Sequence, residues 1–430
     1  MLSAAQPKPS AAPDREFVLR RYLEIRADTE RLAAPLATED YVVQAMADVS
    51  PPKWHLAHVT WFFENFIAAP YARGFAPFHP GFGYLFNSYY ETVGSFFPRL
   101  QRGLLSRPTV DEIYRYRAHV DRVVADVIDT VGDKCWDEVA RRIELGLHHE
   151  QQHQELLLTD LKYNFAFNPL RPAYRAADKA DAEGSAPTDG SASRAAGWRE
   201  FAAGVREIGW AGDGFAFDNE RPRHRVFLEP FRIADRLVTS GEYLAFIADG
   251  GYARADLWLS EGWKTVKERD WKAPLYWERI DGEWWQMTLA GMRRVAEREP
   301  VCHVSYYEAD AFARWAGKRL PTEAEWETAA ASVAIRGNFR ESGRLHPAPA
   351  NGYAQLFGDV WEWTSSSYSP YPGYRPLAGS LGEYNGKFMV NQYVLRGGSC
   401  ATPAAHMRTT YRNFFYGPDR WQFMGIRLAE

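Results

Sequence analysis

The chain has 430 residues, enough for two or three domains that each bury a hydrophobic core. It carries 51 Lys and Arg against 55 Asp and Glu, and the net charge of −4 excludes a global positive field that recruits nucleic acid or anionic membranes. No uninterrupted apolar stretch reaches ~18 residues, and the N-terminal segment lacks the apolar core of a signal peptide. We therefore expect a cytoplasmic protein with small-molecule partners and neither nucleic acid nor membrane among them.

Four long segments of the first 165 residues place apolar side chains at helical spacing. They are 14–36, 54–71, 109–131 and 136–165. Segments of this kind are typical of an antiparallel four-helix bundle. The second and third are joined by 75–108, which is rich in Gly, Pro and aromatic residues. We read this stretch as a structureless connection, and one that long in a compact domain usually has a function.

The composition changes at 175–197, where Ala, Asp, Ser and Gly replace every large apolar residue. We expect a linker or mobile loop there, between a helical domain at 1–174 and a second domain at 198–430. The second part has short β-like runs at 224–234, 393–399 and 425–429, and one clear helix at 305–318. Thr322 and Glu325 form a capping box ahead of another helix. The fold class predicted is thus α+β in two domains.

Aromatic residues make up 15% of the chain, and their placement is uneven. Thirteen of the 16 tryptophans follow the expected linker, where regular structure is sparse and large rings can supply the core. The cysteines, Cys135, Cys302 and Cys400, are widely separated and odd in number. This favours reduced thiols over a disulfide framework.

The strongest chemical signal is the segment HHEQQHQEL at 148–156. His149 and His153 are four residues apart on a predicted helix, so both imidazoles can face one metal ion. A second pair, His55 and His58, lies in WHLAH on another predicted helix. Facing helices of a bundle are a usual place for such a site. We expect His58 as the third ligand, on the buried face of its helix, with His55 as the alternative.

His149-Glu150-x-x-His153 also matches the zinc metalloprotease pattern, in which Glu150 would be the general base. No further ligand follows in metzincin spacing, and the preceding sequence is helical, whereas zincin sites are usually accompanied by strands. A site of three neutral imidazoles leaves two or three coordination positions open. It can activate water on zinc or bind oxygen on ferrous iron.

PPKWHLAHVTWFFENF and HHEQQHQEL together resemble the DinB-like bundle of the iron-dependent sulfoxide synthases of ergothioneine and ovothiol biosynthesis. EPVCHVSYYEADAFARWAGKRLPTEAEWETAA, FGDVWEWTSSSY, YVLRGGSCA and MGIRLA resemble the formylglycine-generating enzyme domain, a C-type-lectin-like architecture. Each fold alone hosts several activities. Their fusion in this order is specific to the synthases, and the resemblance covers nearly the whole chain.

The resemblance implies an Fe(II)- and O2-dependent coupling of a thiol, cysteine or γ-glutamylcysteine, to imidazole C2 of hercynine (Nα-trimethylhistidine), giving a sulfoxide. The implied Fe(2+) ligands are His58, His149 and His153. Gln152 matches the family position that contacts the substrate imidazole. Arg412, Asn413 and Phe414 match the motif that lines the betaine pocket. An aromatic ring suits a quaternary ammonium, which cannot donate hydrogen bonds, and Asn413 can orient the carboxylate.

The sequence departs from the family pattern at two places. Many members have an Asp, which binds the amino group of γ-glutamylcysteine, where this chain has Phe415. Free cysteine is therefore a credible co-substrate. No catalytic tyrosine aligns securely in the second domain, whereas the connection at 75–108 offers Tyr89 and Tyr90. A phenol near iron can donate a proton or a hydrogen atom and steer the reaction away from thiol dioxygenation. We expect Tyr90 to be the donor, with Tyr89 as the alternative.

Arginines are further candidates, because a guanidinium fork suits the carboxylate of a thiol substrate. Arg99 and Arg102 follow the tyrosines, and Arg420 follows the betaine motif.

Three other functions compete with the synthase. A DinB-type zinc hydrolase or thiol transferase does not explain the fused second domain. A formylglycine-generating oxidase needs a cysteine pair where only Cys400 occurs, and a binding module does not explain the histidines.

Overall fold

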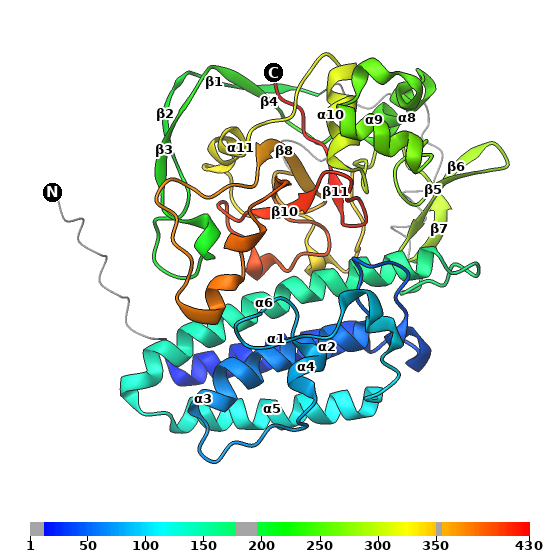
Figure 1. Ribbon diagram of the computed structural model, residues 1–430. Coiled ribbons are helices and arrows are strands. Elements are labelled where there is room, and N and C mark those ends of the chain that lie inside the picture. The colour runs from blue at the N-terminus through cyan, green and yellow to red at the C-terminus, as the bar shows by residue number, and fades with distance from the viewer. Residues whose placement is uncertain (1–12, 178–195, 350–354) are drawn as a thin grey trace. The chain divides into compact units, whose positions relative to one another are not determined.

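A computed structural model describes residues 13–177, 196–349 and 355–430 (Figure 1). These residues fall into two compact units. The first lies within Met1–Val43, Ser50–His153 and Ala211–Phe217, and the second within Gln44–Val49, Gln154–Trp210 and Asp218–Glu430. Most of the linker expected at 175–197 lies outside the described residues. The domain boundaries drawn from the sequence therefore stay a prediction.

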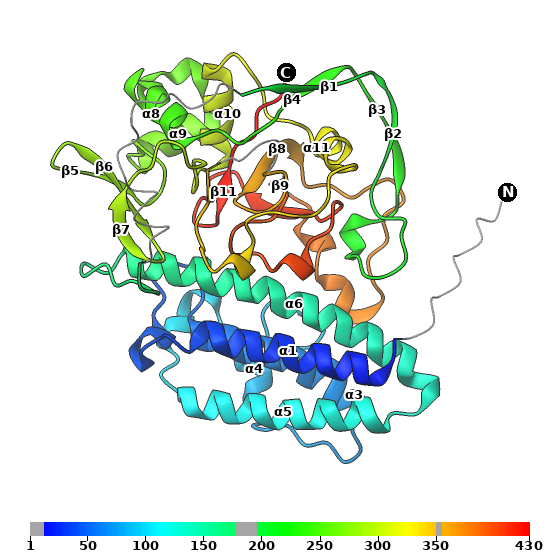
Figure 2. The same cartoon turned by 180° about the vertical axis from the view of Figure 1, so that it is seen from behind.

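The first unit is a helix bundle, as predicted. Its long helices lie alongside one another when seen from the front and from behind (Figures 1 and 2). They are α1 (Arg15–Ala33), α2 (Pro52–Phe63), α5 (Val110–Thr130) and α6 (Asp133–Ala166), of which α6 continues into the second unit. Each overlaps one of the four segments with helical periodicity. No helix of the described residues is both long and apolar enough to cross a membrane.

Helix α2 is buried along its entire length. All twelve residues from Pro52 to Phe63 are buried, because the other helices cover every side of it. The predicted helix at 54–71 continues through a π turn, Glu64–Ala68, into α3 (Ala69–Tyr71). The carboxylate of Glu64 accepts a hydrogen bond of 2.6 Å from the Tyr116 hydroxyl, and burial raises its pKa. This polar anchor holds the π turn, which often occurs at functional sites.

The connection between α2 and α5 contains more regular structure than expected. It includes α4 (Phe82–Phe86) and a 3₁₀ helix, Arg99–Leu104, and another 3₁₀ helix, Thr38–Val42, precedes α2. Between α4 and this 3₁₀ helix, the Asn87 side chain donates to the carbonyls of Tyr90 and Gly94, at 3.1 and 2.9 Å. The side chain thus closes a turn that the backbone alone would leave open. The tyrosines therefore lie on an ordered loop.

The second unit contains small sheets and many loops, in agreement with the predicted domain. Its strands are β1 (Trp198–Phe201), β2 (Gly204–Ile208), β3 (His224–Leu228), β4 (Phe231–Ala234), β5 (Trp277–Ile280), β6 (Glu283–Thr288), β7 (Gly291–Arg294), β8 (Trp361–Ser367), β9 (Gln392–Arg396), β10 (Asn413–Tyr416) and β11 (Met424–Gly425). The largest sheet has the order β10-β9-β8-β11. β10 pairs antiparallel with β9, and Phe415 lies opposite Tyr393.

Four further helices belong to the second unit, and a Ser or Thr side chain caps the start of three of them. They are α8 (Ser240–Ala248), α9 (Ser260–Glu268), α10 (Tyr306–Trp315) and α11 (Glu323–Ala330). The predicted capping box of α11 is confirmed, since Thr322 and Glu325 exchange hydrogen bonds between side chain and backbone. Helices α8 and α9 were not predicted from the sequence. A capping box formed by Thr239 and Glu242 starts α8 and was a readable signal for it.

The last turns of α6 belong to the second unit and make buried polar contacts within it. The Glu155 carboxylate accepts from Trp361 Nε1 at 2.8 Å and from Thr402 Oγ1 at 2.7 Å. Seven residues after Glu155 on α6, Lys162 Nζ lies 2.7 Å from His303 Nε2. Burial lowers the pKa of Lys162 to about 8. Both Glu155 and Lys162 thus have hydrogen-bond partners inside the second unit.

The core of the second unit also holds fully buried ion pairs. Glu362 accepts from Arg427 Nε at 2.6 Å and from Trp326 Nε1 at 2.7 Å, and both charged side chains are completely buried. Burial raises the pKa of Glu362, whereas the Arg427 guanidinium opposes that shift. Such a pair is costly to break, because removing one partner leaves the other charge uncompensated.

Replacing Glu362 by Gln should therefore lower the free energy of unfolding of the second unit by about 3–5 kcal/mol. Glu268→Gln is the control. Its partner Lys264 is 3.8 Å away, both side chains are more than half exposed (71% and 63%), and its loss should cost less than about 1 kcal/mol. Thermal and denaturant unfolding followed by tryptophan fluorescence measures both. Equal stability of the two variants would contradict the role given to the buried pair.

Candidate metal centre

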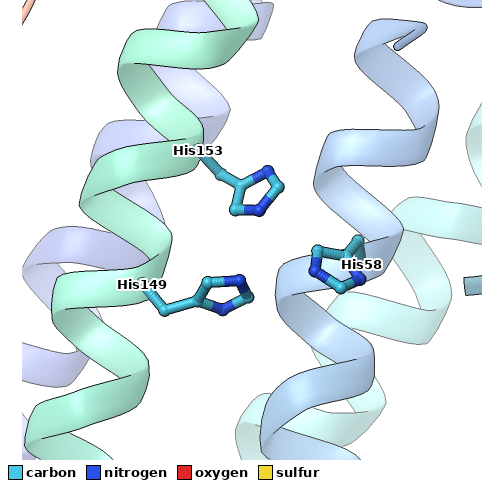
Figure 3. Close-up of side chains that lie close together, drawn as sticks. All are labelled: His58, His149 and His153. Atoms are coloured by element: carbon cyan, nitrogen blue, oxygen red, sulfur yellow. The ribbon is translucent and has the colours of Figure 1, made fainter. Parts of the chain in front are cut away.

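Three imidazoles from two helices of the first unit point toward one another (Figure 3). His58 comes from α2, and His149 and His153 lie one turn apart on α6. Their possible ligand atoms all lie within 4.8 Å of one another. The His58 ring centroid is 5.0 Å from that of His149 and 4.8 Å from that of His153. The structure thus brings together the three histidines that the sequence predicts.

Hydrogen bonds on the outer ring nitrogens orient two of these imidazoles. His58 Nδ1 donates to the Phe86 carbonyl at 2.6 Å. This leaves His58 Nε2 with a lone pair, and that buried atom has no hydrogen-bond partner among the described residues. His153 Nδ1 lies 2.9 Å from His55 Nδ1, so one of the two donates. A hydrogen bond to the nitrogen that does not bind the metal fixes the tautomer and the ring orientation of a metal-binding histidine.

Burial keeps the imidazoles neutral. It lowers the pKa of His149 to about 3 and that of His58 and His153 well below the usual 6.5, with their mutual proximity adding to the last two shifts. A metal needs the unprotonated ring nitrogen, which is the form present here at neutral pH. A set of three neutral nitrogen donors, one of them an orphaned buried atom, fits a divalent transition metal with open coordination positions.

Glu150 takes no part in this cluster. Its Oε2 accepts from Arg26 at 2.9 Å, and its Oε1 accepts from Thr29 at 2.7 Å and from Arg117 at 3.2 Å. Both carboxylate oxygens are therefore occupied, and the side chain is fully buried between two cations. A general base needs an accessible lone pair near the metal. The metalloprotease reading of this segment is therefore wrong, and Glu150 ties α6 to α1 and α5.

The two candidate tyrosines stack on each other beside the cluster. Their ring centroids are 4.7 Å apart, and Tyr90 is fully buried. The Tyr90 ring lies 5.5 Å from that of Trp61, which in turn is nearly parallel to the His58 ring at 5.7 Å. Tyr90 is thus separated from an imidazole of the cluster by one aromatic ring, and Tyr89 is the outer member of the pair.

The candidate arginines of the first unit differ in their surroundings although they share one 3₁₀ helix. Arg99 is exposed. Arg102 is buried, and its guanidinium donates to Ser50 Oγ at 2.9 Å and to Ser88 Oγ at 3.2 Å. The guanidinium carbon also lies 3.4 Å from the centroid of the Trp54 ring. Arg102 therefore has protein partners on two edges and one face.

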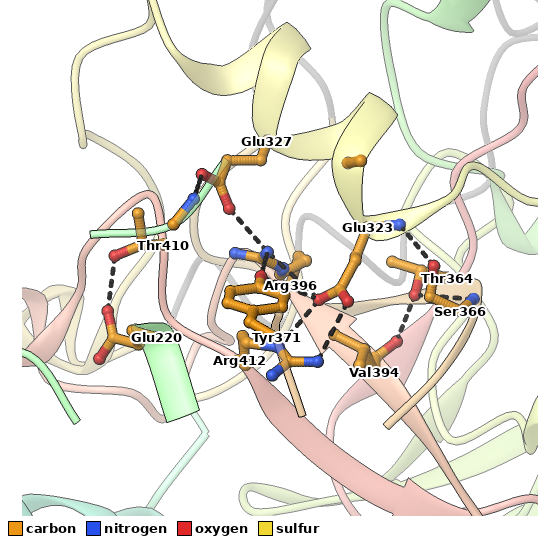
Figure 4. Close-up of polar contacts among 12 residues, drawn as sticks. Glu220, Glu323, Glu327, Thr364, Ser366, Tyr371, Val394, Arg396, Thr410 and Arg412 are labelled. Carbon is orange, nitrogen blue, oxygen red and sulfur yellow. Dashed lines mark hydrogen bonds and ion pairs between the residues drawn. The ribbon is translucent and has the colours of Figure 1, made fainter. Parts of the chain in front are cut away.

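Arg412, expected to bind substrate, is instead built into the core of the second unit (Figure 4). Its guanidinium donates to Glu323 at 2.9 Å and to the carbonyls of Asn219 and Ser369, each at 2.9 Å. Only 1% of the residue is exposed. Direct contact with a substrate does not fit this environment. The spacing of a motif does not reveal such partners, since they come from distant segments.

The other candidates of the second unit lie on or near β10. Phe414 stacks on Tyr368 with ring centroids 4.0 Å apart, and the Asn413 side chain accepts from the Phe414 amide at 3.0 Å. Phe415 packs edge-on against Trp421 at 5.6 Å. Arg420 donates to Glu308 at 2.9 Å and to the Ala273 carbonyl at 3.0 Å, and it stacks on Trp271.

Comparison with known proteins identifies the family. The DinB superfamily matches residues 21–157, and the sulfatase-modifying factor enzyme 1-like domain matches residues 200–351 and 336–430. A hercynine oxygenase of Mycolicibacterium thermoresistibile is 32% identical over 97% of this chain and 96% of its own length. The chain belongs to the hercynine oxygenase family. A second member, from Mycobacterium tuberculosis, is 32% identical over 89% of this chain and 91% of its own.

The C-terminal part has relatives outside this family. A formylglycine-generating enzyme of Streptomyces coelicolor is 33% identical over 44% of this chain and 73% of its own length. That similarity covers one domain, whereas the hercynine oxygenases match nearly the whole chain. The expected family, its two-domain fold and its oxygenase class are thereby confirmed.

His55 should act on the metal through His153. Replacing His55 by Phe removes the hydrogen bond to His153 Nδ1, and we expect metal affinity to fall by about 10–100-fold, as for other outer partners of metal-binding histidines. Titration of the apo-protein with Fe(II) or Co(II) measures this. His79→Ala, at an exposed histidine of the same unit, is the control. Unchanged affinity in the His55 variant would show that the hydrogen bond does not orient the ligand.

Proposed function

We propose that this protein is an Fe(II)- and O2-dependent sulfoxide synthase that joins a thiol to imidazole C2 of hercynine in the cytoplasm. The observation that carries the proposal is the cluster of His58, His149 and His153 in a chain whose full-length relatives are hercynine oxygenases. Ferrous iron, when bound, would supply oxygen activation and open coordination positions for substrates. The hydrogen atoms of C2–H and S–H leave as water with one oxygen atom, and the other oxygen becomes the sulfoxide.

Hercynine presents an imidazole, a carboxylate and a trimethylammonium group. We assign the imidazole to Gln152, which directly precedes the ligand His153 on α6. The trimethylammonium needs an aromatic face, and the stacked rings of Phe414 and Tyr368 offer one. Asn413 supplies the amide for the carboxylate. Arg412 supports these residues indirectly, because its bonds to Glu323 and two carbonyls hold the start of β10.

Tyr90 is the proposed proton or hydrogen-atom donor, with Tyr89 as the alternative. Burial protects the Tyr90 phenol from bulk water, and its ring packs against Trp61 beside the His58 imidazole. A donor held in this way can deliver hydrogen to reacting oxygen before the thiol is oxidised further. Asn87 contributes by fixing the loop through the Tyr90 carbonyl.

Free cysteine is the proposed thiol. At the family position of the acid that binds the γ-glutamyl amino group, Phe415 packs on Trp421 and offers no charge. Arg420, a candidate for a carboxylate, is held by Glu308 and the Ala273 carbonyl. Exposed Arg99 is the arginine that we assign to the carboxylate of cysteine, since its fork suits two oxygens.

The direct test is an aerobic incubation of the iron-loaded protein with hercynine and either cysteine or γ-glutamylcysteine, followed by mass analysis. We expect a hercynyl-cysteine sulfoxide, and a kcat/KM for cysteine at least tenfold above that for γ-glutamylcysteine. This ratio corresponds to about 1.4 kcal/mol of transition-state binding. Absence of sulfoxide with both thiols would refute the proposed function, whereas a preference for γ-glutamylcysteine would refute only the assignment of the thiol. His149→Ala is the inactive control.

Tyr90→Phe should shift the products from sulfoxide toward the sulfinic acid of the thiol, because the phenolic hydrogen is lost while the ring packing is kept. A single general acid contributes about 10²–10⁴-fold in rate, so we expect sulfoxide formation to fall by at least 10²-fold. Tyr89→Phe serves as the matched comparison. If the product ratio stays the same in both variants and in the double variant, neither tyrosine is the donor.

A further inference from the structure

The His58 imidazole lies in a stack of aromatic rings along α2. Trp54, His58 and Trp61 follow one another at spacings of four and three residues, so they share one face of the helix. The His58 ring is 4.5 Å from the Trp54 ring and 5.7 Å from the Trp61 ring, each with an interplanar angle of 11°. The ligand is therefore sandwiched between two nearly parallel indoles.

The stack ends in a buried cation. The Arg102 guanidinium carbon lies 3.4 Å from the centroid of the Trp54 ring, and Arg102 is only 4% exposed. A guanidinium over an indole face is a favourable cation–π pair, and more so when both are removed from water. His58 stacks on one face of the Trp54 ring, and the Arg102 guanidinium packs on the other face.

Trp54 and His58 both donate hydrogen bonds to neighbouring carbonyls of the segment that ends α4. Trp54 Nε1 donates to the Leu85 carbonyl at 3.3 Å, and the next carbonyl, that of Phe86, accepts from His58 Nδ1. Trp54 also lies 6.2 Å from the ring of His153, the ligand on the other helix. The position of this one indole is therefore coupled to two of the three imidazoles.

Arg102 connects the stack with the tyrosine loop. It donates to Ser50 Oγ, which precedes α2, and to Ser88 Oγ, the residue before Tyr89. A guanidinium has five donors in a fixed fork, so it can hold both hydroxyls while it stacks, which an ammonium cannot do. The fork thereby links the start of the ligand-bearing helix to the loop that carries the two tyrosines.

We propose that Trp54 and Arg102 are positioning residues of the metal centre: the Arg102–Trp54 pair clamps the face of His58 and sets the loop of Tyr89 and Tyr90 relative to it. The part that concerns the tyrosines rests on the proposed function. The part that concerns His58 does not, because it predicts metal binding by the protein without substrates.

The test uses the full chain, freed of metal and titrated with Co(II), whose visible absorption reports both affinity and ligand geometry. Trp54→Leu should weaken Co(II) binding by about 10–100-fold and change the absorption bands, while Trp54→Phe, which keeps a ring on His58, should retain most of the affinity. Arg102→Met and Arg102→Lys should both weaken binding, since neither keeps the stacked fork. Trp136→Leu is the matched control, because Trp136 also carries an arginine, Arg15, at 4.5 Å but touches no ligand.

Wild-type affinity and bands in Trp54→Leu, or equal loss in Trp54→Phe and Trp54→Leu, would overturn the proposal. Circular dichroism and thermal unfolding show whether each variant is folded. If Trp54→Leu does not fold, the arginine variants decide, and wild-type binding in both would overturn it. With hercynine and cysteine added, Arg102→Met should raise the fraction of sulfinic acid. If no variant or wild type forms sulfoxide, the proposed function fails while the Co(II) result still tests the clamp.

Discussion

The site depends on keeping three imidazoles neutral and directed at one point in the buried interior of a helix bundle. Burial provides the first condition, since it lowers the pKa of each ring far enough that the metal-binding form predominates. It also creates a cost, because every polar atom around the rings needs a partner. The carbonyl of Phe86 and the ring of His55 meet that need, and in doing so they set the direction of the remaining nitrogens. The same two hydrogen bonds therefore satisfy the buried ring nitrogens and orient the imidazoles.

Buried ion pairs with a structural role stabilise the helix bundle around the three imidazoles. Glu150 lies next to the ligand His149 in sequence, yet it neutralises Arg26 and Arg117 from two other helices. Helix α2 can therefore be buried on every side, with the neighbouring helices fixed around it. In the second unit, the pair of Glu362 and Arg427 and the bonds of Arg412 perform the same task for a domain with short strands and many loops.

Periodicity and spacing predicted the features that depend on local sequence. The four long helices, the capping box of Thr322 and Glu325, and the histidines four residues apart follow from side-chain repeats that a helix imposes. The trio of His58, His149 and His153 was predicted in full because helix faces are readable from sequence. Helix α8 was missed although the capping box of Thr239 and Glu242 marks its start, whereas α9 begins without a side-chain cap and gives no such local signal.

Roles of long polar side chains could not be predicted in this way. Arg102, Arg412 and Arg420 lie in or near motifs that suggest substrate binding, and each guanidinium has partners that come from remote segments. Glu150 fits a protease pattern letter by letter, and the positions of Arg26 and Arg117 show that its carboxylate has a structural role instead. The identity of a residue shows what it can bind, whereas the fold decides what is within reach.

The central claim is that His58, His149 and His153 hold one ferrous ion with positions open to oxygen and substrate. Electron paramagnetic resonance of the anaerobic protein, loaded with Fe(II) and treated with nitric oxide as an oxygen analogue, tests it most directly. The account predicts one ferrous-nitrosyl signal per chain, a change in its shape when hercynine is added, and its loss in His149→Ala. A signal that persists unchanged in His149→Ala, or no signal in the wild-type protein, would contradict it.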